Sequence, residues 1–320
     1  MKIATRDAYG AFLAEDAKAN KDVIVLDADL SKSTKTAEFE KVAPERFFNV
    51  GIAEQNLIGI AAGLAAEGKI PFASSFAIFA AGRGFEVIRN SVCYPKLNVK
   101  ICATHAGLTV GPDGGSHQAI EDIAIMRSLP NMTVINPADA VSAKALLKSA
   151  LEHQGPVYVR LGRAPVPICH SENTKFEIGK GIKLKEGKDI AIVATGIMVS
   201  RALEASAKLD ELGIKSSVID MHSLKPFDNA LITNLAQTTG KIVTVEEHSV
   251  IGGLGSAVCE VVADTCPVPV RRMGVQDTFG ESGSPDELLQ HHGLTVEDIV
   301  KVCKDMVGTP SEIEFVENTN

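Results

Sequence analysis

Short apolar runs alternate with segments of helical periodicity along nearly the whole chain, and this alternation restricts the possible folds more than any other feature of the sequence. Parallel strands need a connection that crosses back over the sheet, so strands separated by helices are typical of parallel α/β proteins. Strands are expected at Val23–Asp27, Phe47–Val50, Ile70–Ser75, Val99–Ala103, Thr133–Ile135, Val157–Arg160, Ile190–Ala194, Lys215–Asp220, Lys241–Glu246 and Val268–Met273. We therefore predict an α/β fold with mostly parallel sheets and helices on both faces.

The alternation is interrupted once, and this interruption divides the chain into two parts. Residues 166–188 have mixed charge, several glycines and no clear periodicity, as linkers do. A chain of 320 residues is long enough for two domains of ordinary size. We predict a first α/β domain at residues 1–165, a linker at 166–188 and a second α/β domain at 189–310.

Two motifs predict where helices begin. Asn136-Pro137 would place an N-cap residue before a proline at the first helical position, opening a helix that runs to about Glu152. Ser284-Pro285, followed by Glu287, has the spacing of a capping box.

Charge and hydropathy argue against several classes of partner. The formal net charge is -8 and no long basic stripe is present, so a nucleic acid is not expected as a partner. No apolar run approaches the roughly 20 residues that span a bilayer, and the N-terminal residues lack the apolar core of a signal peptide. We expect a cytoplasmic protein without a membrane partner. The six cysteines lack Cys-x-x-Cys spacing and are expected to be reduced packing residues, with no metal site.

Glu54 is an isolated carboxylate between a strand and a helix of small residues. The helix that it opens, residues 56–66, has no charged side chain and is expected to be buried nearly all round. A carboxylate at the start of such a helix should be buried as well. The alternative is an acidic residue that stabilises the helix dipole, and Glu54 taken alone favours this alternative.

The segment Thr104–Gln118 is a glycine-rich polar loop that follows an expected strand. It carries His105, Asp113 and His117, which supply hydrogen-bond donors, an acceptor and proton-transfer capacity. Ligands bind at the carboxyl edge of parallel sheets, and fifteen residues without secondary structure are uncommon in a compact domain unless they are functional. We favour a ligand site over an ordinary surface loop, and a site without metal because the two histidines lack metal-ligand spacing.

Two further groups of residues are weaker candidates. Phe76 and Phe79 could form the wall of a flat binding site, although phenylalanines at this spacing are more often part of the core. Arg6, Arg160 and Arg163 could hold a phosphate, although isolated arginines are usually solvated.

Together, the segments Gly51–Gln55, Phe76 with Phe79, and Thr104–Gln118 resemble the transketolase family of thiamine diphosphate enzymes. The resemblance covers essentially the whole chain and corresponds to the C-terminal half of a transketolase. This half comprises the pyrimidine-binding domain and the C-terminal domain, as in transketolases that are split into two subunits. The segments Ile3–Arg6, Leu224–Asp228 and Val245–His248 are also similar to that family.

The resemblance implies a cofactor site. Glu54 would bond the N1′ atom of the aminopyrimidine of thiamine diphosphate and share a proton there, which favours the imino tautomer. Phe76 and Phe79 would pack against the pyrimidine ring, and Asp29 and Leu30 would approach the cofactor from the end of the first strand.

The resemblance also implies a substrate site for sugar phosphates. In the family, residues matching His117 and Asp113 bond the reacting hydroxyls of the sugar. The substrate phosphate would be held by His105, Arg6, Ser33 and Arg163. Glu54, His117 and His105 would be the catalytic residues. Gly82 departs from the family, because an aromatic or long side chain often completes the pyrimidine pocket at this position.

One half of the family's cofactor site is missing from the chain. The motif that holds the diphosphate and Mg²⁺ (or Ca²⁺), Gly-Asp-Gly followed some 30 residues later by Asn, does not occur. An N-terminal subunit would therefore supply that half, in an α2β2 heterotetramer, and the chain alone would be inactive. The resemblance implies transfer of a two-carbon ketol unit between ketose and aldose phosphates, as in the pentose phosphate pathway.

Three alternatives remain open at this point. A 1-deoxyxylulose-5-phosphate synthase shares the motifs around Glu54 and His117, although the Ile3–Arg6 segment favours transketolase. The β subunit of a 2-oxo acid dehydrogenase shares the architecture and the glutamate, but the loop from Asp113 to His117 argues against it. A non-catalytic scaffold is less expected because the candidate site residues are all present.

Overall fold

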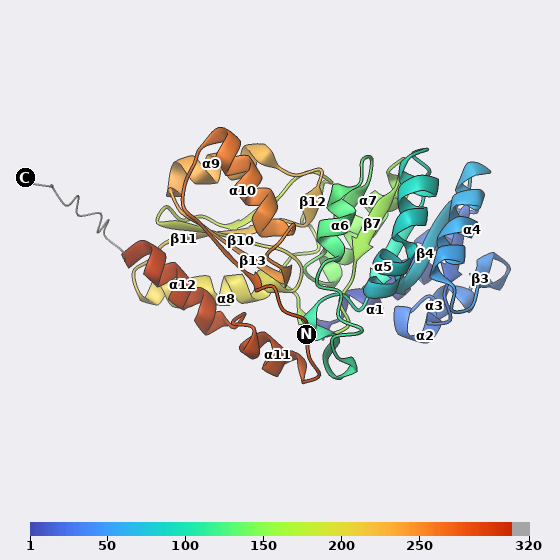
Figure 1. Cartoon of the computed structure of the whole chain (residues 1–320), viewed down its shortest axis with the longest axis horizontal. Helices are drawn as coiled ribbons and strands as arrows, with labels where there is room; N and C mark the ends of the chain where they lie inside the picture. The colour runs from blue at the N-terminus through green and yellow to red at the C-terminus, as the bar shows by residue number, and fades with distance from the viewer. Residues whose placement is uncertain (309–320) are drawn as a thin grey trace, which may run out of the picture.

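The computed structural model describes residues 1–308, and its first domain is built on a seven-stranded sheet in the order β12-β6-β7-β5-β4-β2-β3 (Figure 1). The strands from this domain are β2 (Val23–Asp27), β3 (Phe47–Asn49), β4 (Ile70–Phe76), β5 (Lys100–Thr104), β6 (Thr133–Ile135) and β7 (Val157–Arg160). They are all parallel to one another. The predicted α/β class is confirmed, and each predicted strand of this half is present within one or two residues of its expected bounds.

Helices cover both faces of this sheet. They are α1 (Thr5–Glu15), α2 (Ser31–Thr34), α3 (Ala37–Glu40), α4 (Glu54–Ala66), α5 (Ala77–Val87), α6 (Asp122–Ser128) and α7 (Ala140–Glu152). Tyr9 and Leu146, from α1 and α7, belong to the apolar core on one face. Leu57 and Ala80, from α4 and α5, belong to the core on the other. The parallel strands are therefore buried on both sides, as their continuous apolar runs predict.

The second domain contains a five-stranded sheet in the order β14-β13-β10-β11-β9. Its strands are β9 (Ile182–Lys185), β10 (Ile190–Ala194), β11 (Ser216–Asp220), β13 (Ile242–Ser249) and β14 (Val270–Val275). Its helices are α8 (Met198–Glu211), α9 (Asn229–Thr239), α10 (Leu254–Thr265), α11 (Pro285–His291) and α12 (Val296–Gly308). α8 and α12 lie on one face of the sheet, and α9 and α10 on the other (Figure 1). Only the edge strand β9 is antiparallel to its neighbour.

The strands β1, β8, β9 and β12 were not expected from the sequence, and β12 joins the two domains. β12 (Ser223–Lys225) leaves the second domain and pairs antiparallel with β6 of the first. The segment predicted as a linker contains β8 (Val166–Pro167), which pairs with β1 (Lys2–Ile3), as well as β9. Strands this short carry too few residues for a visible period, and the domain bounds 1–165 and 189–310 stay a prediction.

Side chains cap the starts of α7 and α11, but the start of α7 differs from its prediction. α7 begins at Ala140 rather than near Pro137, and its N-cap is Asp139, whose carboxylate accepts a hydrogen bond from the backbone nitrogen of Ser142 at 2.8 Å. The predicted capping box of Ser284 and Glu287 is confirmed at α11.

The burial predicted for α4 is wrong for half of the helix. Leu57, Ile58 and Ala61 are fully buried against the sheet and α5, whereas Asn56 and Gly59 are exposed. The small residues of α4 are compatible with burial of either face, and in the structure only one face packs against the rest of the chain.

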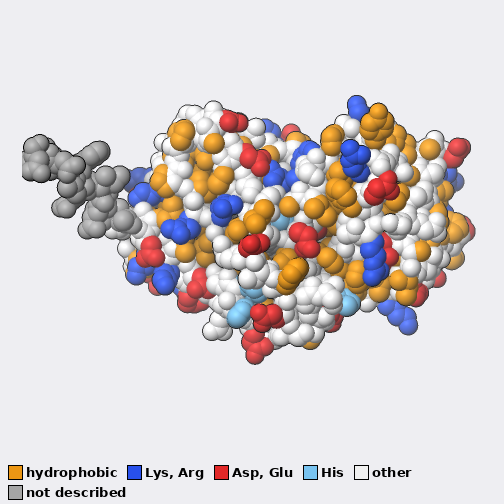
Figure 2. Space-filling model, viewed as in Figure 1, with side chains coloured by type: hydrophobic (Ala, Val, Ile, Leu, Met, Phe, Trp, Pro, Cys, Tyr) orange, Lys and Arg blue, Asp and Glu red, His pale blue; other side chains and the backbone are white. Residues whose placement is uncertain are grey.

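The surface seen in Figure 2 has acidic and basic side chains interspersed over both domains, without a large area of one sign. Within residues 1–308, the structure has no helix that is long and apolar enough to cross a membrane.

Candidate active site

Glu54 lies in the first turn of α4, directly after the loop that follows β3. It is 4% exposed, so the burial predicted for its carboxylate is confirmed. Its Oε1 accepts a hydrogen bond from Nη1 of Arg83 at 2.9 Å, and Arg83 comes from the neighbouring helix α5. A cleft of about 450 Å³ opens beside the pair and is lined by Ala53, Glu54, Gln55, Asn56 and Arg83.

Phe76 and Phe79 form an aromatic wall next to this carboxylate. Phe76 ends β4 and Phe79 lies in the first turn of α5, with their rings stacked and their centroids 5.8 Å apart. The guanidinium of Arg83 lies 4.6 Å from the centroid of Phe79. Arg83 thus contacts both Glu54 and Phe79. Sequence reasoning missed it, although its position four residues after Phe79 places both on one helix face.

His105 is held in a fixed orientation beside Phe76. It follows β5 with a left-handed backbone (φ 57°), and its ring stacks on Phe76 with the centroids 3.7 Å apart. Its Nε2 lies 3.0 Å from Nη1 of Arg6. Burial, followed by the charges of Arg6 and Arg163, lowers the pKa of His105 to about 3. The ring is therefore neutral near pH 7 and accepts a hydrogen bond from Arg6.

Arg6 reaches this position from α1 and connects two predicted site residues. Its Nη1 also donates to the backbone oxygen of Ser33, at 3.0 Å. Its Nε is buried and has no hydrogen-bond partner within the described residues. A buried donor without a partner costs free energy, so this nitrogen is available for an acceptor that binds here.

His117 and Asp113 lie on the same loop as His105 and face two different groups. The ring of His117 meets Phe79 edge-on, with the centroids 5.4 Å apart. Asp113 pairs with Arg163 through an Nη1–Oδ1 distance of 3.1 Å, and both side chains are about one-third exposed. The structure therefore brings both histidines to the aromatic wall and brings Asp113 to Arg163. Part of this loop is a 3₁₀ segment, η4 (Leu108–Asp113), so it is not structureless.

Asp29 and Leu30 lie at the same carboxyl edge of the sheet, just after β2. Asp29 has a left-handed backbone (φ 65°), and its Oδ1 accepts a hydrogen bond from Asn49 at 3.1 Å. The backbone nitrogen of Leu30 donates to Asp27 at 2.6 Å. Within residues 1–308, no hydrogen bond or ion pair links Asp29 or Leu30 to Glu54 or to the aromatic wall, so their role as cofactor contacts stays a prediction.

Arg160 is not available for a phosphate, contrary to one sequence interpretation. It is 4% exposed, and its Nε lies 2.9 Å from Oδ2 of Asp122. Its Nη2 donates to two backbone oxygens, those of Ala119 and Glu247. This guanidinium holds parts of the two domains together.

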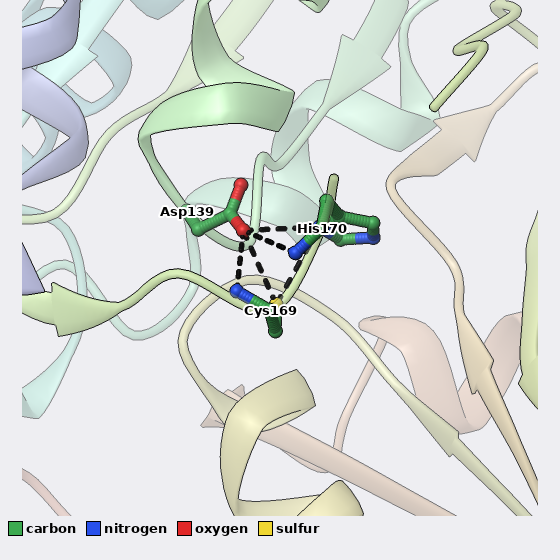
Figure 3. A group of neighbouring side chains, drawn as sticks. All are labelled: Asp139, Cys169 and His170. Carbon is green, nitrogen blue, oxygen red and sulfur yellow. Dashed lines mark hydrogen bonds and ion pairs between the residues drawn. The ribbon is translucent and has the colours of Figure 1, made fainter. Parts of the chain in front are cut away.

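A second histidine cluster lies away from this site, where the linker meets both domains. Figure 3 shows Asp139, Cys169 and His170, with Oδ2 of Asp139 at the centre of their contacts. This oxygen accepts from the backbone nitrogens of Cys169 and His170, at 2.8 and 2.9 Å, and lies 3.2 Å from Nδ1 of His170. The other ring nitrogen of His170 lies 3.2 Å from Asp220.

The charge state of this cluster follows from its two carboxylates. Burial alone would lower the pKa of His170, but the hydrogen bond to Asp139 and the nearby carboxylate of Asp220 raise it to about 12. His170 is therefore charged near pH 7. Because Oδ2 of Asp139 is already occupied by two backbone amides, we interpret the cluster as a lock between the linker and the two domains.

Comparison with protein families gives two matches that together span most of the chain. Residues 1–167 match the family described as "Transketolase, pyrimidine binding domain". Residues 179–299 match the family described as "Transketolase, C-terminal domain".

Individual relatives have the same extent as this chain. It is 53% identical over 299 residues to the "Putative transketolase C-terminal section" of Methanocaldococcus jannaschii, with 92% of this chain and 94% of that protein covered. It is 45% identical to a "6-deoxy-6-sulfo-D-fructose transketolase subunit" of a Clostridium species, with 94% of each covered. A solved structure titled "Split gene transketolase, inactive beta4 tetramer" is 59% identical, has a TM-score of 0.90, and covers 96% of this chain and 99% of its own.

Proposed function

The chain belongs to the transketolase family as the C-terminal subunit of a split transketolase, and from this premise we propose that it supplies the pyrimidine side of a thiamine diphosphate site to an N-terminal partner. The pair would transfer a two-carbon ketol unit between ketose and aldose phosphates. The observation that carries the proposal is the buried carboxylate of Glu54 beside the stacked rings of Phe76 and Phe79.

The residues present fit a thiamine diphosphate. Glu54 is buried at the mouth of a helix and lines an open cleft, while two stacked phenylalanines offer an apolar surface to a flat ring. When bound, the cofactor supplies a carbanion and an electron sink for carbon–carbon bond cleavage. Arg83 occupies Oε1 of Glu54, which leaves Oε2 for the proton that the carboxylate would share with N1′. Glu54 would thus hold that proton, and Phe76 and Phe79 would orient the ring.

The substrate phosphate would bind between Arg6, Arg163 and the neutral ring of His105. Arg6 has a buried Nε without a partner, and its Nη1 is already fixed by His105 and Ser33. A guanidinium held in one orientation loses little entropy when it binds an anion. His117, which lies against Phe79, and Asp113 would bond the sugar hydroxyls.

The partner would supply the diphosphate and metal half of the site, with Mg²⁺ or Ca²⁺, in an α2β2 assembly. The exposed face of α4 supports this proposal, as does Ile52 just before it, whose side chain is 75% exposed. An apolar surface next to a catalytic carboxylate is expected to be covered by another polypeptide. The name of the similar solved structure calls a tetramer of β subunits inactive, which also agrees with a need for a second type of subunit.

The test is reconstitution with thiamine diphosphate, Mg²⁺ and an N-terminal subunit that carries Gly-Asp-Gly and the downstream Asn. Glu54→Gln should lower turnover of phosphorylated ketoses roughly 10²- to 10⁴-fold, because loss of a positioned acid–base group has an effect of this size. Glu67→Gln, an exposed position just beyond the other end of α4, serves as the matched control and should leave turnover unchanged. Turnover by this chain without a partner, or an active Glu54→Gln complex, would refute the proposal.

A further inference from the structure

The loop that carries His105, Asp113 and His117 belongs to the first domain, but the second domain holds it. Near the end of β13, Oε1 of Glu247 accepts hydrogen bonds from the backbone nitrogen of Thr109 at 2.6 Å and from its Oγ1 at 2.8 Å. Glu247 is 4% exposed and Thr109 is 3% exposed. Both bonds are made where water cannot compete, so they fix the middle of the loop firmly.

A second contact holds the end of the loop. Gln118, the residue after His117, donates from Nε2 to the backbone oxygen of Glu281 at 2.8 Å. The same nitrogen lies 3.3 Å from the backbone oxygen of Leu108 and 3.2 Å from that of Gly111, both within the loop. Glu281 lies between β14 and α11. Two separate segments of the second domain, β13 and this connection, therefore form hydrogen bonds with one loop of the first domain.

The glycines of the loop are explained by this close approach. A Cβ atom on Gly107 would lie 2.1 Å from Oε1 of Glu247, and one on Gly115 would lie 2.4 Å from the backbone oxygen of Gly280. On the other side of the contact, a Cβ on Gly280 would lie 1.7 Å from Oε1 of Gln118. No side chain fits at these positions. The glycine-rich composition therefore allows the two domains to pack, in addition to shaping a ligand loop.

Glu247 bonds Thr109, and the next residue in the loop contacts Arg163 of the proposed phosphate site. The backbone oxygen of Val110, next to Thr109, accepts a hydrogen bond from Nη1 of Arg163 at 2.5 Å. The same nitrogen pairs with Asp113. A shift of Thr109 would therefore move the group that orients Arg163.

We propose that Glu247 is a positioning residue, through which the second domain sets the position of the substrate-facing loop. Glu247 does not touch the proposed substrate groups itself. It acts through Thr109 and Val110 on Arg163, and through the loop as a whole on His105 and His117. The inference rests on the proposed function only where it assigns the loop to sugar phosphates, because the contact between the domains exists independently of any activity.

The contact depends on an acceptor oxygen more than on charge. Burial raises the pKa of Glu247 to about 7, although Arg160 and the bonds from Thr109 oppose this shift. A glutamine side chain keeps an oxygen at the position of Oε1 and should preserve the bonds to Thr109. An alanine removes the acceptor and leaves the backbone nitrogen of Thr109 buried without a partner.

The test compares Glu247→Ala with Glu247→Gln by two measurements. In the complex reconstituted with the N-terminal subunit, thiamine diphosphate and Mg²⁺, Glu247→Ala should raise the KM for a phosphorylated ketose roughly ten-fold or more, the size expected for a lost buried hydrogen bond. Hydrogen exchange of residues 105–118 in the full-length chain should become faster, while the cores of both sheets stay protected. Glu247→Gln should resemble the wild type in both measurements.

A second glycine with a positive φ provides a control for crowding at this contact. Gly107 and Gly68 have φ of +80° and +84°, but of these two only Gly107 faces a neighbouring side chain. Gly107→Ala should raise both the KM and the exchange rate of the loop, and Gly68→Ala should change neither.

Two outcomes would overturn the positioning role. One is a Glu247→Ala variant with unchanged loop exchange and unchanged KM. The other is a uniform increase in exchange over the whole second domain, which would make Glu247 a general packing residue. If the wild-type complex transfers no ketol unit at all, the proposed function fails, but hydrogen exchange still decides whether Glu247 holds the loop.

Discussion

His105 and His170 are both buried, yet their surroundings carry opposite charge. His105 lies beside Arg6 and near Arg163, and burial with these two charges lowers its pKa to about 3. His170 lies between the carboxylates of Asp139 and Asp220, which overcome the effect of burial and raise its pKa to about 12. One ring is neutral in a cationic site and the other is a cation in an anionic site.

The difference shows which kind of charge each site lacks. The two carboxylates around His170 already hold a cation that belongs to the same chain. The site around His105 contains two arginines, of which Arg163 pairs with Asp113, and Arg6 has a buried Nε without a partner. A site rich in positive charge suits an anion, whereas carboxylates that already hold a cation of their own chain suit stability.

The largest expected effect is on the stability of the lock. His170→Ala leaves two buried carboxylates without their cation and should lower the free energy of unfolding by about 3–5 kcal/mol. His105→Asn should lower it less, by about 1–2 kcal/mol, because asparagine tolerates the left-handed backbone and the lost ring, although packed on Phe76, is uncharged. Urea unfolding of both variants measures the contrast. Equal losses of stability would show that the two clusters do not differ in the way described.

The next effect is on acid stability. Since the folded pKa of His105 is about 3, the unfolded chain binds more protons below pH 6.5, and the stability of the wild type should fall as the pH drops from 6.5 towards 3. His105→Asn removes this contribution, so the variant should gain on the order of 1–3 kcal/mol relative to the wild type at pH 4.

Unfolding of the wild type and His105→Asn at pH 4 and pH 7 measures this relative gain. Groups present in both proteins, including Glu247, cancel in the difference. The contribution of His170 is complete below pH 6.5 and is lost progressively as the pH rises from there to about 12, and it also cancels because both proteins contain His170. A gain that is the same at pH 4 and pH 7 would contradict the low pKa of His105.

A smaller effect is expected on substrate affinity. Arg6→Met removes the guanidinium with the unpaired Nε and should raise the KM for phosphorylated ketoses roughly ten-fold or more, the value of a charge-assisted hydrogen bond. An unphosphorylated ketose should be used equally well by the variant and the wild type. Arg89→Met, at an exposed position outside the site, is the control. If Arg6→Met changes the KM for phosphorylated and unphosphorylated ketoses to the same extent, Arg6 does not bind the substrate phosphate.

The smallest effect is expected at the ion pair of Arg83 and Glu54. The side chain of Arg83 is 56% exposed, so Arg83→Met should lower the free energy of unfolding by less than about 1 kcal/mol. This loss of stability can be compared with that of His170→Ala, where an ion pair is shielded from water. Thermal unfolding of the variant measures it, and a loss close to that of His170→Ala would contradict the role of burial.

Much of the fold could be predicted from local patterns. Strands such as β2 and β10 are continuous apolar runs between helices, and their bounds match the prediction. β1, β8, β9 and β12 were missed because an edge strand of a few residues is stabilised by its neighbours rather than by its own periodicity. The buried face of α4 was overestimated for a related reason, since small apolar residues do not show which side meets the core.

The individual residues of the candidate site could be predicted, but the contacts that hold them in place could not. Glu54, Phe76, His105 and His117 follow strands in the sequence, and the resemblance to transketolases assigned their roles. Arg83 and Glu247 were missed. Arg83 is an ordinary surface residue until α4 packs against α5, and Glu247 is one acidic residue among several until β13 lies beside the loop at Thr109.

The sequence by itself determined the α/β class, the order of the main strands, the family and the type of chemistry, because these depend on periodicity and on residue types at short spacing. Only the tertiary structure decided which arginine is buried in an ion pair, which histidine is charged, and which domain holds the substrate-facing loop. Those properties depend on burial and on distances between residues far apart in the chain. The pKa of a histidine is set by the charges within a few ångströms of it, and the packing of the two domains brings those charges together.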